Sequence, residues 1–329
     1  MPRKAHGASP SWEISKFLSA QGLARCFAGP IVGYSSTIRS PARPLRRRGV
    51  DILHLGSIGL GRGDAAVTAK LKGIILAGGK GTRLDPVTRV VNKHLLPIYD
   101  APMVAYPIAA LVEAGVDDIV VVTNPQDIAD FRSVLGDGSA LGLSSLAFAE
   151  QQQAGGIADA LLCAEDLVGD QPICVVLGDN ILSSTVAPMV KRFAGNPVGA
   201  RLLLAEVHDP HGLGVVRFET PLVAGGGLPR VIEILEKPST PPSRHAVIGV
   251  YLYGPDVFAV CRSVQPSARG ELEITAVNSA YLAKGACSFD VIDGWWTDAG
   301  TFEGLHEAAT LVAFERKRGS RIGLSRAAG

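Results

Sequence analysis

The stretch Leu76-Ala-Gly-Gly-Lys-Gly-Thr-Arg-Leu84 predicts the fold of this 329-residue chain. It continues the apolar run Leu71-Lys-Gly-Ile-Ile-Leu76, which is typical of a buried parallel strand. The closely spaced glycines that follow leave backbone N–H groups bare above the end of that strand, and such an arrangement suits phosphate groups. Arg83 adds a fixed, charged fork for phosphate oxygens. The stretch therefore indicates an α/β protein with a phosphate-binding loop after its first strand.

Two common glycine motifs do not fit this loop. A Walker loop begun at Gly73 would need a lysine where Gly79 stands. The dinucleotide fingerprint would need a third glycine where Leu84 stands. The next segment, Val91-Asn-Lys-His-Leu-Leu-Pro-Ile98, places Lys93 a short loop away from the glycines. The two segments together favour a phosphate site of another type.

Composition narrows the class of protein. Hydrophobic residues make up 47% of the chain and the mean hydropathy is +0.24, so a sizeable core can be buried. No apolar run approaches the roughly 20 residues that span a bilayer. The net charge of +1 gives no general attraction to nucleic acid or to a membrane. Scattered cysteines indicate free thiols in a reducing cytoplasm and no structural zinc: Cys26, Cys163, Cys174, Cys261 and Cys287.

Residues 1–68 differ in character from the rest of the chain. The first fifty residues hold nine Lys or Arg against a single acid, Glu13, and no sustained amphipathic period. This composition favours a basic, disordered extension, which is either a transit peptide or a solvated arm. The alternative is that translation starts near Leu71 and that the segment is not part of the working protein. We expect one folded domain over residues 69–317 and a tail over 318–329.

From Leu71 the pattern predicts alternating strands and helices. The expected strands are short apolar runs without period-2 alternation, which indicates a sheet covered by helices on both faces. The prediction is a Rossmann-like, mostly parallel sheet in three α/β/α layers, with ligands at the carboxyl ends of the strands. Closer spacing after about Val198 predicts a smaller mixed-sheet subdomain. The expected strands are 73–77, 119–123, 145–149, 173–177, 201–206, 215–218, 231–235 and 246–253, and the expected helices are 103–113, 126–135, 157–167, 256–264, 272–283 and 302–316.

Two acidic residues stand at expected structural boundaries. Val175-Val-Leu-Gly-Asp-Asn180 ends an apolar strand, so the carboxylate of Asp179 is expected at the ligand edge of the sheet. Asp298 lies in Gly294-Trp-Trp-Thr-Asp-Ala-Gly-Thr301, just before an expected helix. Read alone, each acid fits a helix cap as well as a metal ligand. Two carboxylates this far apart in sequence can still converge on one Mg²⁺.

The segment GIILAGGKGTRLDPVTRVVNKHLLPIYDAPM, residues 73–103, resembles the signature of the sugar-1-phosphate nucleotidyltransferases. Its ending is most similar to the glucose-1-phosphate thymidylyltransferases of that family, and the likeness runs from about Leu71 to about Ala309. The resemblance implies a catalytic domain over 69–317 that transfers a nucleotidyl group from dTTP to glucose 1-phosphate, with Mg²⁺ as cofactor and pyrophosphate released. It also implies a cytoplasmic homo-oligomer. UTP, another sugar 1-phosphate, or a catalytically silent nucleotide-sugar sensor remain the alternatives.

The resemblance also gives roles to individual residues. Arg83 and Lys93 carry over as catalytic cations on the triphosphate, and Asp179 and Asp298 as the metal ligands. Gln151 carries over to the base, because an amide donates and accepts at once and can pair with thymine or uracil. The nucleotide-binding set is Ala77, Gly78, Gly79, Gly81, Thr82, Arg83, Gln151, Gly156 and Asp179. The sugar-phosphate-binding set is Gly214, Glu236, Lys237, Gly249 and Glu271.

Two positions depart from the family pattern. His94 stands where glutamine is common, directly after the predicted catalytic lysine. Leu213 stands where an aromatic residue usually packs near the sugar. Both departures adjoin predicted site residues, so they bear on the choice of nucleotide and of sugar.

Overall fold

The computed structural model describes residues 68–221 and 228–319. The predicted extension, apart from Thr68, and the tail beyond Gly319 lie outside the described residues, as does Cys26. Within these two ranges no helix has the length and apolar character that crossing a membrane requires. The expectation of free thiols is confirmed for the four cysteines that the ranges contain, which are Cys163, Cys174, Cys261 and Cys287.

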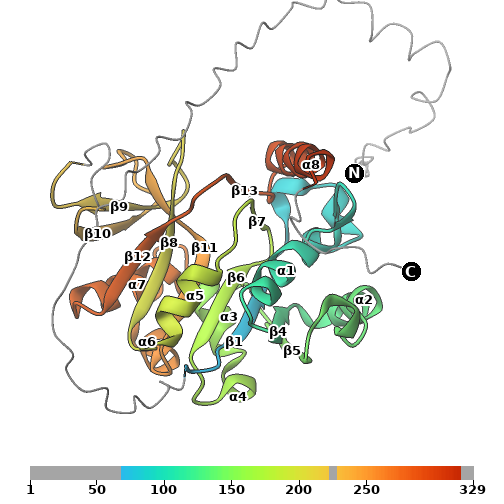
Figure 1. The fold of residues 1–329 in the computed structure, drawn as a ribbon, viewed down its shortest axis with the longest axis horizontal. Helices are drawn as coiled ribbons and strands as arrows, with labels where there is room; N and C mark the ends of the chain where they lie inside the picture. The colour runs from blue at the N-terminus through green and yellow to red at the C-terminus, as the bar shows by residue number, and fades with distance from the viewer. Residues whose placement is uncertain (1–67, 222–227, 320–329) are drawn as a thin grey trace, which may run out of the picture. The chain divides into compact units, whose positions relative to one another are not determined.

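One nine-stranded sheet organises the described residues (Figure 1). At its centre β1 (Lys72–Leu76) pairs with β4 (Asp118–Thr123) on one side and with β6 (Ile173–Leu177) on the other. Beyond β4 lies β5 (Ser145–Glu150), and these four strands all run parallel. The predicted parallel sheet of short apolar strands is therefore confirmed.

The remaining strands of the sheet are mixed in direction. The nine-residue β11 (His245–Tyr253) pairs antiparallel with β6 and with β8 (Ala200–Glu206). It also pairs antiparallel with β9 (Gly214–Phe218), which is joined in turn by β10 (Val231–Glu236), while β12 (Cys287–Val291) runs parallel to β8. Because β11 is long enough to pair with β6 at one end and β9 at the other, the predicted mixed region extends the main sheet.

Helices cover both faces of the sheet, as predicted. Adjacent residues of the central strand point to opposite faces, so Ile74 and Ile75 belong to two different buried cores. The core around Ile74 is closed by α3 (Ile157–Leu162), α4 (Glu165–Val168), α6 (Val257–Ser263) and α7 (Ile274–Ala283). The core around Ile75 is closed by α1 (Ala105–Glu113), α2 (Ile128–Leu135) and α5 (Ala187–Ala194).

A third buried cluster attaches the last helix to the ligand end of the sheet. Here α8 (Phe302–Lys317) packs against a small hairpin of β2 (Pro97–Ile98) and β3 (Ala101–Pro102). The helix follows β13 (Trp296–Asp298), which pairs antiparallel with β7 (Asn180–Leu182). Figure 1 shows α8 near these two short strands. The pairing brings segments more than a hundred residues apart to one place.

Four of the predicted helices differ from the structure by two residues or more. Those expected from Met103 and Gln126 begin two residues later, at Ala105 and Ile128. The helix expected over 157–167 is two helices, because the N–H of Ala164 bonds to the carbonyl of Leu161, three residues back, and breaks the regular ladder. The helix expected from Leu272 begins two residues later. The Leu272 N–H is bonded instead to the Gly155 carbonyl at 2.7 Å, so its backbone joins the loop before α3.

Candidate active site

The glycine loop leaves β1 at its carboxyl end and is held there by its first residue. The Ala77 carbonyl accepts a hydrogen bond from Thr123 Oγ1 at 3.0 Å. Gly79 and Gly81 have φ values of 92° and 58°, in the left-handed region that glycine enters without strain. A short turn over Thr82–Leu84 follows and presents Arg83. The chain therefore turns sharply directly after β1.

Two ion pairs bring together the four residues with predicted catalytic and metal-binding roles. Lys93 Nζ lies 2.5 Å from Asp179 Oδ2, and Arg83 Nη2 lies 3.5 Å from Asp298 Oδ2. The backbone adds a link, because the Ala299 N–H donates to the Asp179 carbonyl at 2.8 Å. The structure therefore shows the convergence of the two distant acids that the sequence analysis anticipated, while their chemical roles stay predictions.

Gly300 marks the point at which these side chains meet. A Cβ atom on Gly300 would lie 2.8 Å from Arg83 Nη2, 2.8 Å from Asp298 Oδ1 and 3.1 Å from Asp179 Oδ2. The Gly300 N–H also donates to Asp298 Oδ1 at 2.8 Å, which fixes that carboxylate. A side chain at this position would press on both acids and on the arginine, so glycine keeps the centre of the site open.

The two carboxyl groups have pKa shifts of opposite sign. Burial opposes ionisation of Asp179, but the adjacent Lys93 ammonium outweighs it and holds the pKa of that carboxyl well below its usual range. Burial and the negative charge of Asp179 raise the pKa of Asp298. Two acids that repel each other in this way form a donor set suited to a hard divalent cation. Among the described residues no cluster of three or more metal-ligating side chains exists, so such a cation would draw further ligands from phosphate and water.

His94 is packed beneath the site. Burial and the neighbouring Lys93 charge lower the pKa of His94 to about 3, so its imidazole is neutral. The ring lies against Gly178, the residue before Asp179: a Cβ atom there would come within 2.6 Å of His94 Cδ2. The structure thus places this departure from the family pattern in tight packing under the acidic centre.

Gln151 is the only buried member of the three consecutive glutamines, which supports the predicted register. Its Nε2 donates to Asp159 Oδ2 at 2.8 Å and to the Gly156 carbonyl at 3.2 Å. Both partners can only accept, so the amide orientation is fixed and its donors are both used. Its Oε1 faces the glycine loop, 2.8 Å from the position of a Cβ on Gly78. The amide therefore offers a ligand an acceptor alone, where the sequence analysis expected a donor and an acceptor.

The predicted sugar side is centred on Glu236, at the end of β10. Glu236 Oε2 accepts from Thr275 Oγ1 at 2.5 Å, while its Oε1 lies 3.4 Å from Lys237 Nζ. Arg269 Nη2 lies 3.4 Å from the same carboxylate oxygen and 3.6 Å from Glu271 Oε2. These pairings join two acids and two cations in one cluster.

Gly249 and Gly214 are the glycines of the sugar side. The Gly249 N–H donates to Asn180 Oδ1 at 3.0 Å, and a Cβ there would come within 2.6 Å of Leu177 Cγ. A Cβ on Gly214 would lie 3.2 Å from Thr275 Oγ1. The backbone of the mixed strands therefore comes close to Asn180 at Gly249 and to Thr275 at Gly214.

Almost all of the predicted site residues line one cavity of about 710 Å³. Every predicted site residue borders it except Ala77 and Gly81, which lie behind it in the glycine loop. Leu213 also borders the cavity, on the sugar side. The predicted nucleotide and sugar residues therefore share one space.

Several polar residues that hold the site together were not predicted. Asn180 follows Asp179 directly, so its place in the motif was a usable signal. The others have no local signal, because each bonds to a partner eight or more residues away in sequence: Asn92, Asp127, Asp159, Arg269 and Thr275.

Comparison with known proteins agrees with this geometry. Residues 72–314 match the family model described as nucleotidyl transferase. A glucose-1-phosphate thymidylyltransferase of Neisseria meningitidis is 43% identical over 245 residues, which are 74% of this chain and 82% of that protein. One from Actinoplanes sp. is 45% identical over 257 residues, 77% of this chain and 82% of that protein.

Solved structures give the same result. A Bacillus anthracis structure, described as a glucose-1-phosphate thymidylyltransferase in complex with sucrose, superposes with a TM-score of 0.68 at 44% identity and covers 73% of this chain and 94% of that one. UDP-glucose pyrophosphorylase complexed with UDP-glucose superposes with a TM-score of 0.65 at 26% identity, covering 75% and 99%. The family resemblance in the sequence is thus confirmed: this chain belongs to the nucleotidyl transferase family.

Proposed function

We propose that this chain transfers the thymidylyl group of dTTP to α-D-glucose 1-phosphate, giving dTDP-glucose and pyrophosphate. A phosphate oxygen of the sugar attacks the α-phosphorus, and the bond to the β-phosphate breaks. The observation that carries the proposal is the pairing of Lys93 with Asp179 and of Arg83 with Asp298 at the mouth of the glycine loop. Relatives named glucose-1-phosphate thymidylyltransferase, which are 40–45% identical to this chain, support the choice of substrates.

The reaction needs positioning and charge neutralisation more than a covalent nucleophile. Lys93 and Arg83 approach the phosphates from two sides and neutralise charge as pyrophosphate departs. The bare amides after Ala77 hold the phosphate chain above β1. Lys237, at the end of β10, meets the phosphate of the sugar and Glu236 meets its hydroxyls.

Asp179 and Asp298 are the residues that would hold Mg²⁺. One carboxylate oxygen of each acid lies near the position that a Cβ on Gly300 would take. The pKa of Asp298 is raised in part by repulsion from Asp179, and a bound cation would relieve that repulsion. Carboxylate oxygens are the ligands that Mg²⁺ takes in phosphate-transfer sites. When bound, the ion would stabilise negative charge on the phosphate oxygens.

Gln151 contacts the base through its carbonyl oxygen, which accepts a hydrogen bond. Because its donors are bound to Asp159 and Gly156, its Oε1 is left for the N3–H of thymine or uracil. Cytosine carries a lone pair on N3 and would face another lone pair. Replacement of Gln151 by leucine is expected to raise the KM for dTTP about tenfold and to narrow the preference for dTTP over dCTP, since one buried hydrogen bond is lost. Steady-state kinetics with both nucleotides measure this.

The matched control is the neighbouring glutamine. Gln152 is exposed and hydrogen-bonds only to Glu150 among the contacts of the described residues. Gln152→Leu is expected to leave both KM values unchanged. An equal effect of the two substitutions would assign the base to a different residue.

Lys237 is expected to act on the sugar phosphate alone. It has a positive φ of 44° at the end of β10, which holds its side chain beside Glu236. Lys237→Ala is expected to raise the KM for glucose 1-phosphate about tenfold, as for one charge-assisted hydrogen bond, without changing the KM for dTTP. Initial rates with one substrate varied at a time separate the two constants. A rise confined to dTTP would place Lys237 on the nucleotide.

The decisive experiment is pyrophosphate release with Mg²⁺, in which each nucleoside triphosphate is tested against several sugar 1-phosphates. The highest kcat/KM is expected for dTTP with glucose 1-phosphate. A higher value with UTP or with another sugar 1-phosphate would keep the chemistry and change the substrates, and Leu213 at the sugar side is the feature that favours testing other sugars. Turnover with no pair would favour a nucleotide-sugar sensor. The homo-oligomer stays a prediction, which light scattering would test.

A further inference from the structure

Asn92 occupies the junction between the glycine loop and the turn that carries Lys93. It is 8% exposed and lies directly before the turn over Lys93–Leu95. Its Nδ2 donates to the Ala77 carbonyl at 3.2 Å and to Asp127 Oδ2 at 2.7 Å. Its Oδ1 lies 3.0 Å from the His94 N–H and 2.8 Å from His94 Nδ1. One side chain thus contacts three separate segments.

The amide of Asn92 is used to its full capacity. An asparagine has two donors and can accept two hydrogen bonds, and all four are engaged here. The orientation is fixed because the Ala77 carbonyl and the Asp127 carboxylate only accept, so Oδ1 faces His94. His94 Nδ1 must then carry its proton, since it meets an acceptor. No carboxylate or hydroxyl side chain can make the same four bonds.

Each of these bonds constrains a segment at the active site. The acceptor bond from the His94 N–H caps the turn that begins with Lys93. The bond to Ala77 uses the second lone pair of a carbonyl that Thr123 already holds, directly before Gly78. The loop and the lysine turn are therefore joined through one buried side chain.

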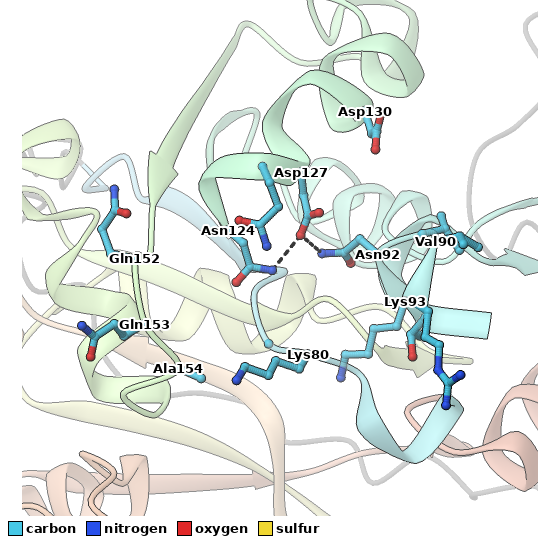
Figure 2. A pocket seen from close by; sticks show the side chains of 15 residues that line it. Lys80, Val90, Asn92, Lys93, Asn124, Asp127, Asp130, Gln152, Gln153 and Ala154 are labelled. Carbon is cyan, nitrogen blue, oxygen red and sulfur yellow. Dashed lines mark hydrogen bonds between the residues drawn. The ribbon is translucent and has the colours of Figure 1, made fainter. Parts of the chain in front are cut away.

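Asp127 anchors the junction to the scaffold. Its Oδ2 also accepts from Asn124 Nδ2 at 2.6 Å, at the point where the chain passes from β4 to α2. Figure 2, which draws a second cavity of about 690 Å³, shows Asn92 and Asn124 hydrogen-bonded to Asp127, with the side chains of Lys93 and Lys80 below them in the view. The carboxylate thus fixes Asn92 to an element that carries no predicted catalytic residue.

We propose that Asn92 is a positioning residue for the transfer reaction: it holds the Lys93 turn and the glycine loop at one separation, so that Lys93 and the loop amides meet the same triphosphate. Asn92 does not border the cavity that the predicted site residues share. It acts through Lys93 and through Ala77. The inference rests on the proposed function and concerns a residue to which neither the family resemblance nor the predicted site gives a role.

The first test is Asn92→Asp, which keeps the shape and the acceptor toward His94 but removes both donors. A carboxylate would then face the Ala77 carbonyl and Asp127, where hydrogen bonds of 3.2 and 2.7 Å now stand. We expect kcat to fall about 10- to 100-fold while the KM for glucose 1-phosphate changes less than about threefold, because displacement of a catalytic group by about 1 Å has an effect of this size. Full kinetics and Tm are measured together.

Rescue separates positioning from general damage. In Asn92→Asp/Asp127→Asn the new amide at 127 can donate to the new carboxylate at 92, which restores the tie to α2. We expect this double variant to recover at least about fivefold of the lost kcat, a coupling typical of residues in direct contact. Asn196→Asp, at an exposed asparagine far from the cavity, is the matched control and is expected to keep the kcat of the unmodified protein.

The outcomes are distinct. Unchanged kcat in Asn92→Asp overturns the proposal, as does a double variant no more active than the single one. Should Asn92→Asp not fold, Asn92→Ser carries the test, since serine also caps a turn but cannot reach Ala77 and Asp127. A fall of kcat in Asn92→Ser at an unchanged Tm supports positioning, and unchanged kcat overturns it. Absence of turnover in the unmodified protein instead refutes the proposed function.

Discussion

Asp179→Asn is expected to lower kcat/KM by at least about 10³-fold and to leave the protein folded, because loss of one preorganised charge at a phosphate centre has an effect of this order. The side chain keeps its shape and can still accept from Lys93, but it loses the charge that pairs with Lys93 and that would hold a cation beside Asp298. Lys93 borders an open cavity, so water can solvate its ammonium in the variant. Pyrophosphate release and Tm report the two effects separately.

A matched control exists elsewhere in the fold. Asp290 in β12 is also paired, at 2.5 Å with Arg192 and at 2.7 Å with Arg201, and its side chain is about as buried as that of Asp179. Asp290→Asn removes an ion pair of the same kind without touching the cavity, so it is expected to keep kcat/KM. Comparable loss in both variants would mean that ion-pair removal damages the fold. Full activity in Asp179→Asn would remove Asp179 from the reacting centre.

The central part of the fold could be predicted because its signals are local. β1, β4 and β6 are short apolar runs, and burial on both faces is what makes each run apolar, while the edge strand β5 is only partly buried. Their ends were predicted to within one residue. The same reasoning failed where a strand exists only through a distant partner. The three-residue β7 and β13 are strands because Trp296 to Asp298 pairs with Leu182 to Asn180, and neither segment has a periodicity of its own.

The site divides in the same way. The glycines, Lys93 and the strand-end acid Asp179 stand in short motifs, and the structure brings them together as expected. The hydrogen-bond partners that orient them are not visible in sequence. Asp159 fixes the amide of Gln151 from eight residues away, and Asp127 fixes Asn92 from thirty-five. In sequence, a single Asp or Asn is as readily explained as a solvent-exposed residue as a buried hydrogen-bond partner. Only the fold shows which of them faces a buried partner.

Gly300→Ala is expected to lower kcat about 10²- to 10³-fold without destabilising the protein. The backbone at Gly300 is not left-handed, so alanine meets no torsional penalty there. Its Cβ would instead lie 2.8 Å from both Arg83 Nη2 and Asp298 Oδ1, closer than real carbon contacts allow. The Arg83 side chain is 59% exposed and that of Asp298 is 27% exposed, so the strain is relieved by displacing a predicted catalytic cation into solvent and by turning the Asp298 carboxylate. Misplacement of such a group by about 1 Å costs about 10²-fold, and loss of its charge stabilisation up to about 10³-fold.

A glycine elsewhere serves as the control for adding a methyl group that displaces no site residue. Gly195, at the end of α5, has a φ of −71°, and the nearest atom to a Cβ there is the Arg192 carbonyl at 3.6 Å, an ordinary contact. Gly195→Ala is therefore expected to keep kcat and, through a smaller loss of chain entropy on folding, to keep or slightly raise Tm. If Gly300→Ala retained the kcat of Gly195→Ala, Arg83 and Asp298 would not need their present positions for turnover. A pyrophosphate-release assay on the two purified variants, at saturating dTTP and glucose 1-phosphate, decides between these results.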